Sequence, residues 1–249
     1  MATLFMRAKY GKLMDRGIPQ KGVSGAGYAP SRKGGSGGYH VRGKQSAHPA
    51  RFDQDRVPGG PWEAVYNPAW TRGHRRVVYT VDGHAHIPGR YAIDFIKVDS
   101  QGRFFQGDSD VVRNWYGYGA RVLAVSDGVV ASTRDSFPES PTVSGHRPCP
   151  ADQGAGNYIS IDIGGRFVFY EHLRPGSITV RPGQRVRKGE VIGALGFTGQ
   201  TVGPHLHLHV ADRNSPLGAE GLPFAFERFD QAGTAVRGEH PAPGAVIAF

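Results

Sequence analysis

The sequence predicts a mainly β protein, built as a compact antiparallel sheet or sandwich with long loops. Three observations support this fold class. From about residue 77 onward, short apolar segments recur, Gly and Pro separate them at close intervals, and no long amphipathic helical pattern occurs. Closely spaced strands with tight turns are typical of antiparallel β domains.

The first predicted strand pair is RVLAV and VVAS, which flank the turn sequence Ser126-Asp127-Gly128. The next pair is YISIDI at 158–163 and RFVFY at 166–170. The two residues Gly164-Gly165 join this pair, and a two-glycine connection is a strong hairpin signal. These two pairs are therefore expected to form hairpins.

Two later segments lead to the end of the predicted sheet. TVRPGQRV contains Pro182-Gly183, which suits a type II turn, and GEVIGALGFTG follows it. Between the two hairpins, residues 135–156 contain many turn-forming residues and are expected to form a long surface loop.

Three regions divide the chain. We expect a flexible, disordered arm at residues 1–60, a folded domain at 61–230 and a C-terminal tail at 231–249. The arm is rich in Gly, Ser, Lys and Arg, and it lacks an apolar pattern that could offset its ordering entropy.

The basic charge of the chain is concentrated at its N-terminal end. Residues 1–76 contain 14 Lys and Arg against 4 Asp and Glu, a net charge of +10, whereas the whole chain has +9 and the remainder therefore −1. We expect the arm either to be solvated or to bind an anionic polymer. No base-reading motif accompanies it, so sequence-specific nucleic-acid binding is not expected.

Other sequence features limit the function classes. No apolar run approaches the length of about 20 residues that a transmembrane helix needs. The apolar run at the start ends at Met6, so no signal peptide is evident. The single cysteine, Cys149, excludes an internal disulfide framework.

The segment GPHLHLHV places a histidine at every second position, at His205, His207 and His209. Alternate side chains of a strand point to the same face, so these imidazoles are expected to lie side by side. Imidazole is a common zinc ligand, and a catalytic zinc site typically has three protein ligands and one open position.

The segment GFTGQTVGPHLHLHV resembles the signature of the lysostaphin/LytM-type zinc endopeptidases of peptidase family M23. Four other stretches agree in order: RYAIDF, VLAVSDGVV, VFYEHL and VRPGQRVRKGEVIGALGFTG. The resemblance spans about residues 90–211. It implies the lysostaphin/LytM type of β fold and an M23-like peptidase domain within 61–230.

The resemblance also implies roles for individual residues. Asp94 and His207 correspond to zinc ligands, and one Zn²⁺ ion is the implied cofactor. His172 and His205 correspond to the pair that activates the attacking water and stabilises the oxyanion. The implied activity is hydrolysis of peptide stems or cross-links of bacterial peptidoglycan, at an extracytoplasmic location.

The sequence departs from the family pattern at Arg90, where the family has a histidine ligand. A guanidinium has no lone pair for zinc. Two accounts remain open. In one, Arg90 pairs with Asp94 and fills the space of the ion, and the domain binds cell wall or regulates an amidase without cutting. In the other, His209 replaces the lost ligand, which restores three ligands with Asp94 and His207.

Three nearby residues are assigned smaller roles. His84 and His86 form a second His-x-His and are expected on a surface strand, although they could reach the site. Glu171 adjoins His172 and, by strand alternation, is expected to face the opposite side of its strand.

Overall fold

The computed structural model describes residues 61–66, 68 and 73–249. The predicted arm at residues 1–60 lies outside these described residues. Within them, the regular structure consists of β-strands and four short 3₁₀ helices. No helix of the described residues is long and apolar enough to cross a membrane.

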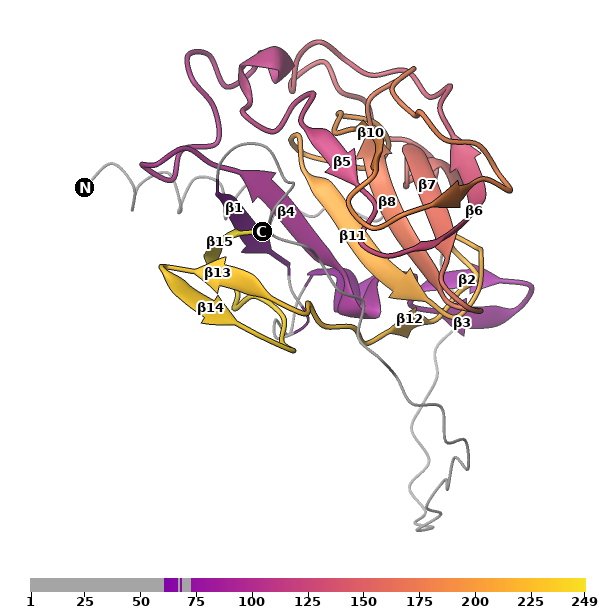
Figure 1. Ribbon diagram of the computed structural model, residues 1–249. Helices are drawn as coiled ribbons and strands as arrows, with labels where there is room; N and C mark the ends of the chain where they lie inside the picture. Colours follow the sequence, from indigo (N-terminus) through magenta and orange to yellow (C-terminus); the bar gives the residue numbers. More distant parts are fainter. Residues whose placement is uncertain (1–60, 67, 69–72) are drawn as a thin grey trace, which may run out of the picture. The chain divides into compact units, whose positions relative to one another are not determined.

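Eleven strands form one large sheet in the order β14-β13-β15-β1-β4-β11-β8-β7-β6-β9, and β12 pairs with β11 off this path. Two further pairs, β10-β5 and β2-β3, form small sheets. Figure 1 shows the central strands β4, β11, β8, β7 and β6 side by side. Every pairing among the strands of the described part is antiparallel, which confirms the predicted fold class.

The elements of the first half, from the N-terminal end, are β1 (Trp62–Val65), η2 (Gly73–Arg76), β2 (Tyr79–Val81), β3 (His84–His86), η3 (Pro88–Tyr91), β4 (Ile93–Lys97), η4 (Val112–Asn114), β5 (Arg121–Leu123) and β6 (Gly128–Arg134). Those of the second half are η5 (Ala151–Gln153), β7 (Asn157–Asp162), β8 (Phe167–Leu173), β9 (Arg185–Val186), β10 (Val191–Ala194), β11 (Leu206–Ala211), β12 (Gly221–Leu222), β13 (Phe229–Gln231), β14 (Thr234–Val236) and β15 (Val246–Ala248).

The hairpin predicted at Gly164-Gly165 is confirmed as the connection from β7 to β8. Both glycines have positive φ, at 92° and 82°, a conformation that side chains with a Cβ rarely adopt. The carboxylate of Asp162 accepts hydrogen bonds from both glycine N–H groups, at 2.9 and 2.7 Å. Local turn chemistry therefore sets the register of these two strands.

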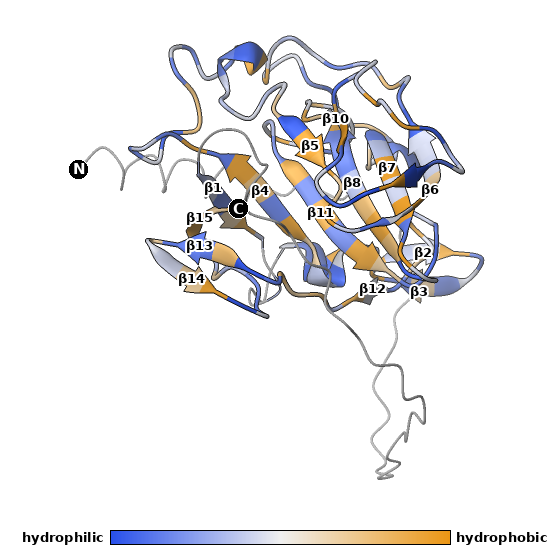
Figure 2. Cartoon of the chain, viewed as in Figure 1, coloured by the Kyte–Doolittle hydropathy of each residue, from blue (hydrophilic) through white to orange (hydrophobic). Residues whose placement is uncertain are grey.

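Strand β11 divides its side chains between two faces. Leu208 and Val210 point into the main hydrophobic core, together with Ile93 of β4 and Val122 of the small β10-β5 sheet. Figure 2 shows the corresponding alternation of hydrophobic and hydrophilic bands along β11. The histidines of β11 consequently share the face opposite to this core.

The C-terminal residues differ from the expected tail. Strand β13 (Phe229–Gln231) crosses the predicted boundary at residue 230, and β15 pairs with both β13 and β1. Ile247 is only 1% exposed and belongs to the main core. Residues 231–249 thus complete the sheet, because the short segment around Ile247 finds its partners only in strands distant in sequence.

Residues 135–156 form the predicted long connection between β6 and β7, with only the short helix η5 inside it. Glu139 ties this loop to the segment before the histidine strand, since its carboxylate accepts a hydrogen bond from the Phe197 N–H at 3.1 Å. It also accepts a close hydrogen bond from the Tyr118 hydroxyl. The loop is therefore fastened to the segment that precedes β11.

Candidate metal and catalytic site

Three neighbouring strands place a row of polar side chains on one face of the sheet. In the Cα register, His207 of β11 lies opposite Asp94 of β4 on one side and opposite Glu171 of β8 on the other. Directly paired residues of antiparallel strands project on the same face. Two carboxylates therefore flank His207, one from each of the strands β4 and β8. These strands lie on either side of β11 in Figure 1.

Asp94 is the centre of this row and is only 2% exposed. Its Oδ1 lies 2.9 Å from Nδ1 of His207. Its Oδ2 lies 3.0 Å from Nε2 of His74 and 3.5 Å from Nε2 of His205. A buried carboxylate is thus surrounded by three imidazoles, which compensate the cost of removing its charge from water.

His74 reaches Asp94 from the short helix η2, and its side chain is 26% exposed. Its ring makes edge contacts with the rings of His207, at 4.5 Å between centroids, and Tyr66, at 5.4 Å. Gly73 has φ of +73°, and a Cβ there would lie 2.3 Å from the Tyr66 ring. Glycine at position 73 therefore lets Tyr66 pack beside His74.

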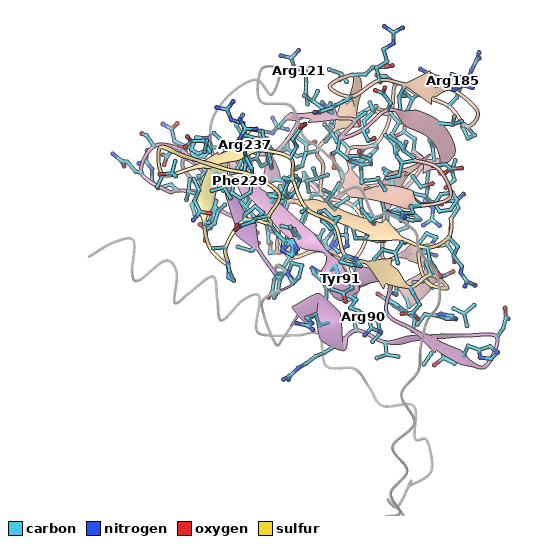
Figure 3. All side chains as sticks on the ribbon, turned by 60° about the horizontal axis from the view of Figure 1, so that its bottom comes forward. Arg90, Tyr91, Arg121, Arg185, Phe229 and Arg237 are labelled. Carbon is cyan, nitrogen blue, oxygen red and sulfur yellow. The ribbon has the colours of Figure 1, made fainter. Side chains whose placement is uncertain are left out.

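Arg90 does not pair with Asp94, so that part of the first account is corrected. Its Nη2 lies 3.3 Å from Oε2 of Glu220. The reason is the 3₁₀ turn η3, on which Arg90 and Tyr91 lie (Figure 3). This turn interrupts the two-residue alternation that would have placed residue 90 on the same face as Asp94.

The second His-x-His also lies away from the Asp94 contacts. His84 is exposed on β3. His86 is partly buried, and its Nδ1 lies 3.3 Å from Oε1 of Glu220. Glu220 therefore neighbours both His86 and Arg90. The expected surface position is confirmed for His84, whereas His86 is partly buried.

His172 and His205 are oriented in the same way by backbone carbonyls. His172 Nδ1 donates to the Thr198 carbonyl at 2.8 Å, and His205 Nδ1 donates to the Gly203 carbonyl at 2.9 Å. A carbonyl can only accept, so each neutral ring carries its proton on Nδ1 and its lone pair on Nε2. Their ring centroids lie 4.7 Å apart.

A local irregularity in β8 explains how His172 and its neighbour Glu171 reach the same site. The β7–β8 register shifts between Asn157 and Ile159, and His172 has φ of +64°. Such an irregularity re-aims a side chain. Glu171 therefore faces His207 across the sheet, and the expectation that it would face the other side is wrong.

His209 lies on the opposite side of His207 from Asp94. Its Nδ1 is 3.1 Å from Nε2 of His207 and 3.9 Å from Oε1 of Glu171. Its ring stacks on Phe169, with centroids 4.8 Å apart and an angle of 6° between planes. His209 shares a cluster with His207 and Glu171, whereas Asp94 shares one with His207 and His74.

Burial and neighbouring charges shift the pKa values at this site. Burial raises the pKa of Asp94, but nearby His74 and His205 and hydrogen bonds from His207 and His74 outweigh it and hold that pKa well below its usual range. Burial lowers the pKa of His172, His205 and His209. An ionised carboxylate therefore lies among imidazoles that favour the neutral form.

His207 and Glu171 shift in the opposite direction. Burial lowers the pKa of His207, but Glu171 and Asp94 outweigh this effect, and the pKa lies above its usual value. Burial raises the pKa of the Glu171 carboxyl. The two flanking acidic groups thus favour the protonated form of the His207 imidazole.

Three candidate ligand groups share His207, and the one with Glu171 and His209 is described above. Ligand atoms of His74, Asp94 and His207 all lie within 4.8 Å of one another, and so do those of His172, His205 and His207. Two imidazoles and one carboxylate are a donor set that suits Zn²⁺. His74 Nε2 and His207 Nδ1 both lie beside the Asp94 carboxylate, so the three donor atoms are close enough together to bind one such ion.

Sequence reasoning missed His74 and misplaced Glu171. His74 precedes Asp94 by 20 residues, and it adjoins the basic N-terminal region rather than a recognisable motif. The only indication in the sequence was that a histidine upstream of Asp94 could replace the missing ligand. His84 and His86 fitted that description equally well, so His74 was not distinguished from them. The position of the Glu171 side chain opposite His207 could have been predicted only from the strand register.

Residues 115–218 match the sequence description of peptidase family M23. The match includes His172, His205, His207 and His209, and it begins after His74 and Asp94.

Two curated relatives match part of this chain. The peptidoglycan DD-endopeptidase ShyA of Vibrio cholerae is 35% identical over 102 residues, which cover 41% of this chain and 20% of ShyA. The peptidoglycan DD-endopeptidase ShyB of the same species is 42% identical over 66 residues, which cover 26% of this chain and 15% of ShyB. The aligned part is thus a fifth or less of each relative.

Two catalytic domains are among the solved structures that match this chain. A mutant catalytic domain of the prophage-encoded M23 protein EnpA from Enterococcus faecalis matches with a TM-score of 0.38 and 17% identity, over 66% of this chain and 89% of that one. The catalytic domain of lysostaphin from Staphylococcus simulans matches with a TM-score of 0.34 and 23% identity, over 58% and 85%.

Proposed function

We propose that the chain is a zinc-dependent endopeptidase of bacterial peptidoglycan, because residues 115–218 match peptidase family M23. The observation that supports the proposal most strongly is the cluster of His74, Asp94 and His207, which supplies three suitable ligand atoms despite Arg90. Two relatives named as peptidoglycan DD-endopeptidases favour peptide cross-links of the cell wall as substrate. Such a substrate implies an extracytoplasmic site of action.

In this proposal, His74 Nε2, Asp94 and His207 Nδ1 hold a single zinc ion. His74 takes the role that the sequence had suggested for His209, because it contacts Asp94 directly, at 3.0 Å. His74 also forms the more exposed side of the cluster. Bound zinc supplies Lewis-acid chemistry and lowers the pKa of a bound water.

His172 and His205 are the proposed catalytic pair. Each has its Nδ1 proton held by a backbone carbonyl, so that the Nε2 lone pair is free to take a proton from water. Once protonated, the same nitrogen donates a hydrogen bond to developing negative charge on the substrate carbonyl. The lowered pKa of both histidines keeps them ready to accept rather than already protonated.

The ligand assignment predicts a distinctive pattern of zinc binding. The parent should bind about one zinc ion per chain, as a single set of three protein ligands requires. His74→Ala should lose most of this zinc, whereas Arg90→Ala should retain it, because Arg90 contacts Glu220 instead of Asp94. Elemental mass spectrometry after dialysis against a weak chelator measures the content.

A hydrolysis assay on purified peptidoglycan tests the activity. The zinc-loaded parent should release new amino termini, and His172→Ala should retain zinc but lose this release. Absence of both zinc and hydrolysis in the parent would instead favour a module that binds the wall or regulates an amidase. Zinc retention by His74→Ala would exclude His74 as a ligand.

A further inference from the structure

His209 and Glu171 are buried beside His207, and the proposed reaction uses neither of them. His209 is 2% exposed and Glu171 is 8% exposed. His209 Nδ1 contacts His207 Nε2 at 3.1 Å, which is within hydrogen-bond distance. The carboxylate of Glu171 lies 3.9 Å from the same His209 nitrogen, which is too far for a hydrogen bond but close for a charge.

The two nitrogens of His207 point to different partners. Nδ1 faces Asp94, and Nε2 faces His209. A neutral imidazole that offers a lone pair at Nδ1 must carry its proton on Nε2. That N–H then has His209 Nδ1 as its acceptor, so the proton of His209 lies on Nε2.

The surroundings of His209 favour an aromatic ring but do not explain an imidazole. One face of the ring stacks on Phe169, and Nε2 has no hydrogen-bond partner in the described part of the chain. A phenylalanine would satisfy such packing without an unpartnered polar atom. The contact with His207 is therefore the interaction that requires a nitrogen at position 209.

We propose that His209 and Glu171 are positioning residues that hold His207 with its Nδ1 lone pair directed to the metal. His209 Nδ1 accepts a hydrogen bond from the Nε2–H group of His207, and the Glu171 carboxylate stabilises the positive charge that the ring gains as a ligand. Outer partners of this kind orient ligand histidines and strengthen their binding to metal. The inference rests on the proposed zinc site of His74, Asp94 and His207.

Two substitutions at position 209 separate this role from packing. His209→Phe keeps the stacked ring and removes the acceptor, whereas His209→Gln removes the ring and keeps a carbonyl acceptor. We expect His209→Phe to weaken zinc binding by about 10–100-fold, a loss typical of an outer partner. His209→Gln should stay close to the parent, and so should the control His84→Phe at an exposed position.

The measurement is the zinc dissociation constant of the full chain, from competition with a chromophoric chelator, together with zinc stoichiometry. A packing role would give the opposite order, with His209→Phe tolerated and His209→Gln impaired, and would overturn the inference. Two ions per chain would also overturn it, since His209 would then serve as a ligand. Failure of the parent to bind zinc would overturn the underlying site itself.

Nitrogen-15 spectra of the zinc-loaded parent provide a test that needs no substitution. The proton of His207 and the proton of His209 should each reside on Nε2. A proton on His209 Nδ1 would contradict the inference, even if His209→Phe failed to fold. Glu171→Gln should leave these tautomers unchanged and weaken zinc binding, because it removes only the charge.

Discussion

At the scale of single residues, the site depends on one ionised carboxylate surrounded by buried imidazoles. Asp94 contacts His74 and His207 at hydrogen-bond distance, and its pKa is held well below the usual range. Other imidazoles of the cluster are held neutral by burial. Because burial disfavours the charged form of these imidazoles, the metal-free cluster should be sensitive to acid.

The first prediction at this scale concerns pH. Without metal, the free energy of unfolding should decrease as pH falls below about 6.5, the ordinary pKa of histidine. His172, His205 and His209 have lowered pKa values, so the unfolded chain takes up protons that the folded chain resists. Each such histidine contributes up to about 1.4 kcal/mol per pH unit.

Glu171 partly opposes this trend, because its raised pKa favours protonation in the folded state. The raised pKa of His207 has a different effect: it adds stability that is fully present below pH 6.5 and is lost as the pH rises above that value. Urea unfolding in the presence of a chelator at pH 7 and pH 5.5 measures the effect. The decrease in the free energy of unfolding from pH 7 to pH 5.5 should be smaller in His209→Phe than in the parent. An equal free energy at the two pH values in the parent would refute the expectation.

At the scale of elements, the loop at residues 135–156 supports the segment that orients His172. The Thr198 carbonyl accepts the hydrogen bond from His172, and the next residue, Gly199, lies against the backbone of Gly154 and Gly156. A Cβ at Gly199 would lie 2.4 Å from the Gly154 oxygen. The long loop therefore helps to fix the position of a proposed catalytic side chain.

A pair of glycine substitutions tests this support. Gly199 and Gly165 both have positive φ, at +77° and +82°, but only Gly165 has open space around its missing Cβ. Gly165→Ala should cost about 1–2 kcal/mol from backbone strain alone. Gly199→Ala should cost more and should also reduce hydrolysis, because the Thr198 carbonyl must move.

Urea unfolding measures the loss of stability, and the appearance of new amino termini in peptidoglycan measures hydrolysis. Equal losses of stability in the two variants, with activity retained in both, would show that the close contact between Gly199 and the loop has no consequence.

At the scale of the whole described domain, a strand from the end of the chain lies between β13 and β1 within the large sheet. β15 pairs with β1, and β1 pairs in turn with β4, the strand that carries Asp94. Ile247 is 1% exposed, whereas its neighbour Val246 is 38% exposed. The last residues thus support the strand beneath the proposed site.

Ile247 is therefore predicted to be important for stability. Ile247→Ala should lower the free energy of unfolding by about 2–5 kcal/mol, the usual cost of a large cavity in a core. Val246→Ala, in the same strand but on the exposed face, should change it by about 0.5 kcal/mol or less. Urea unfolding compares the two, and a similar small effect in both would mean that 231–249 is a tail after all.

Local chemistry in the sequence was enough to determine the fold class and part of the site. Alternation along β11 predicted that His205, His207 and His209 share one face, and Gly164-Gly165 predicted the hairpin from β7 to β8. These features depend on residues within a few positions of one another, so the sequence displays them directly.

Tertiary structure alone decided which side chains meet. The 3₁₀ turn η3 directs Arg90 to Glu220, η2 brings His74 to Asp94 from 20 residues away, and the irregularity in β8 accompanies the inward turn of Glu171. Each result depends on the path of the chain between distant segments. Strand periodicity predicts which face a side chain occupies, but it does not predict its partner on that face.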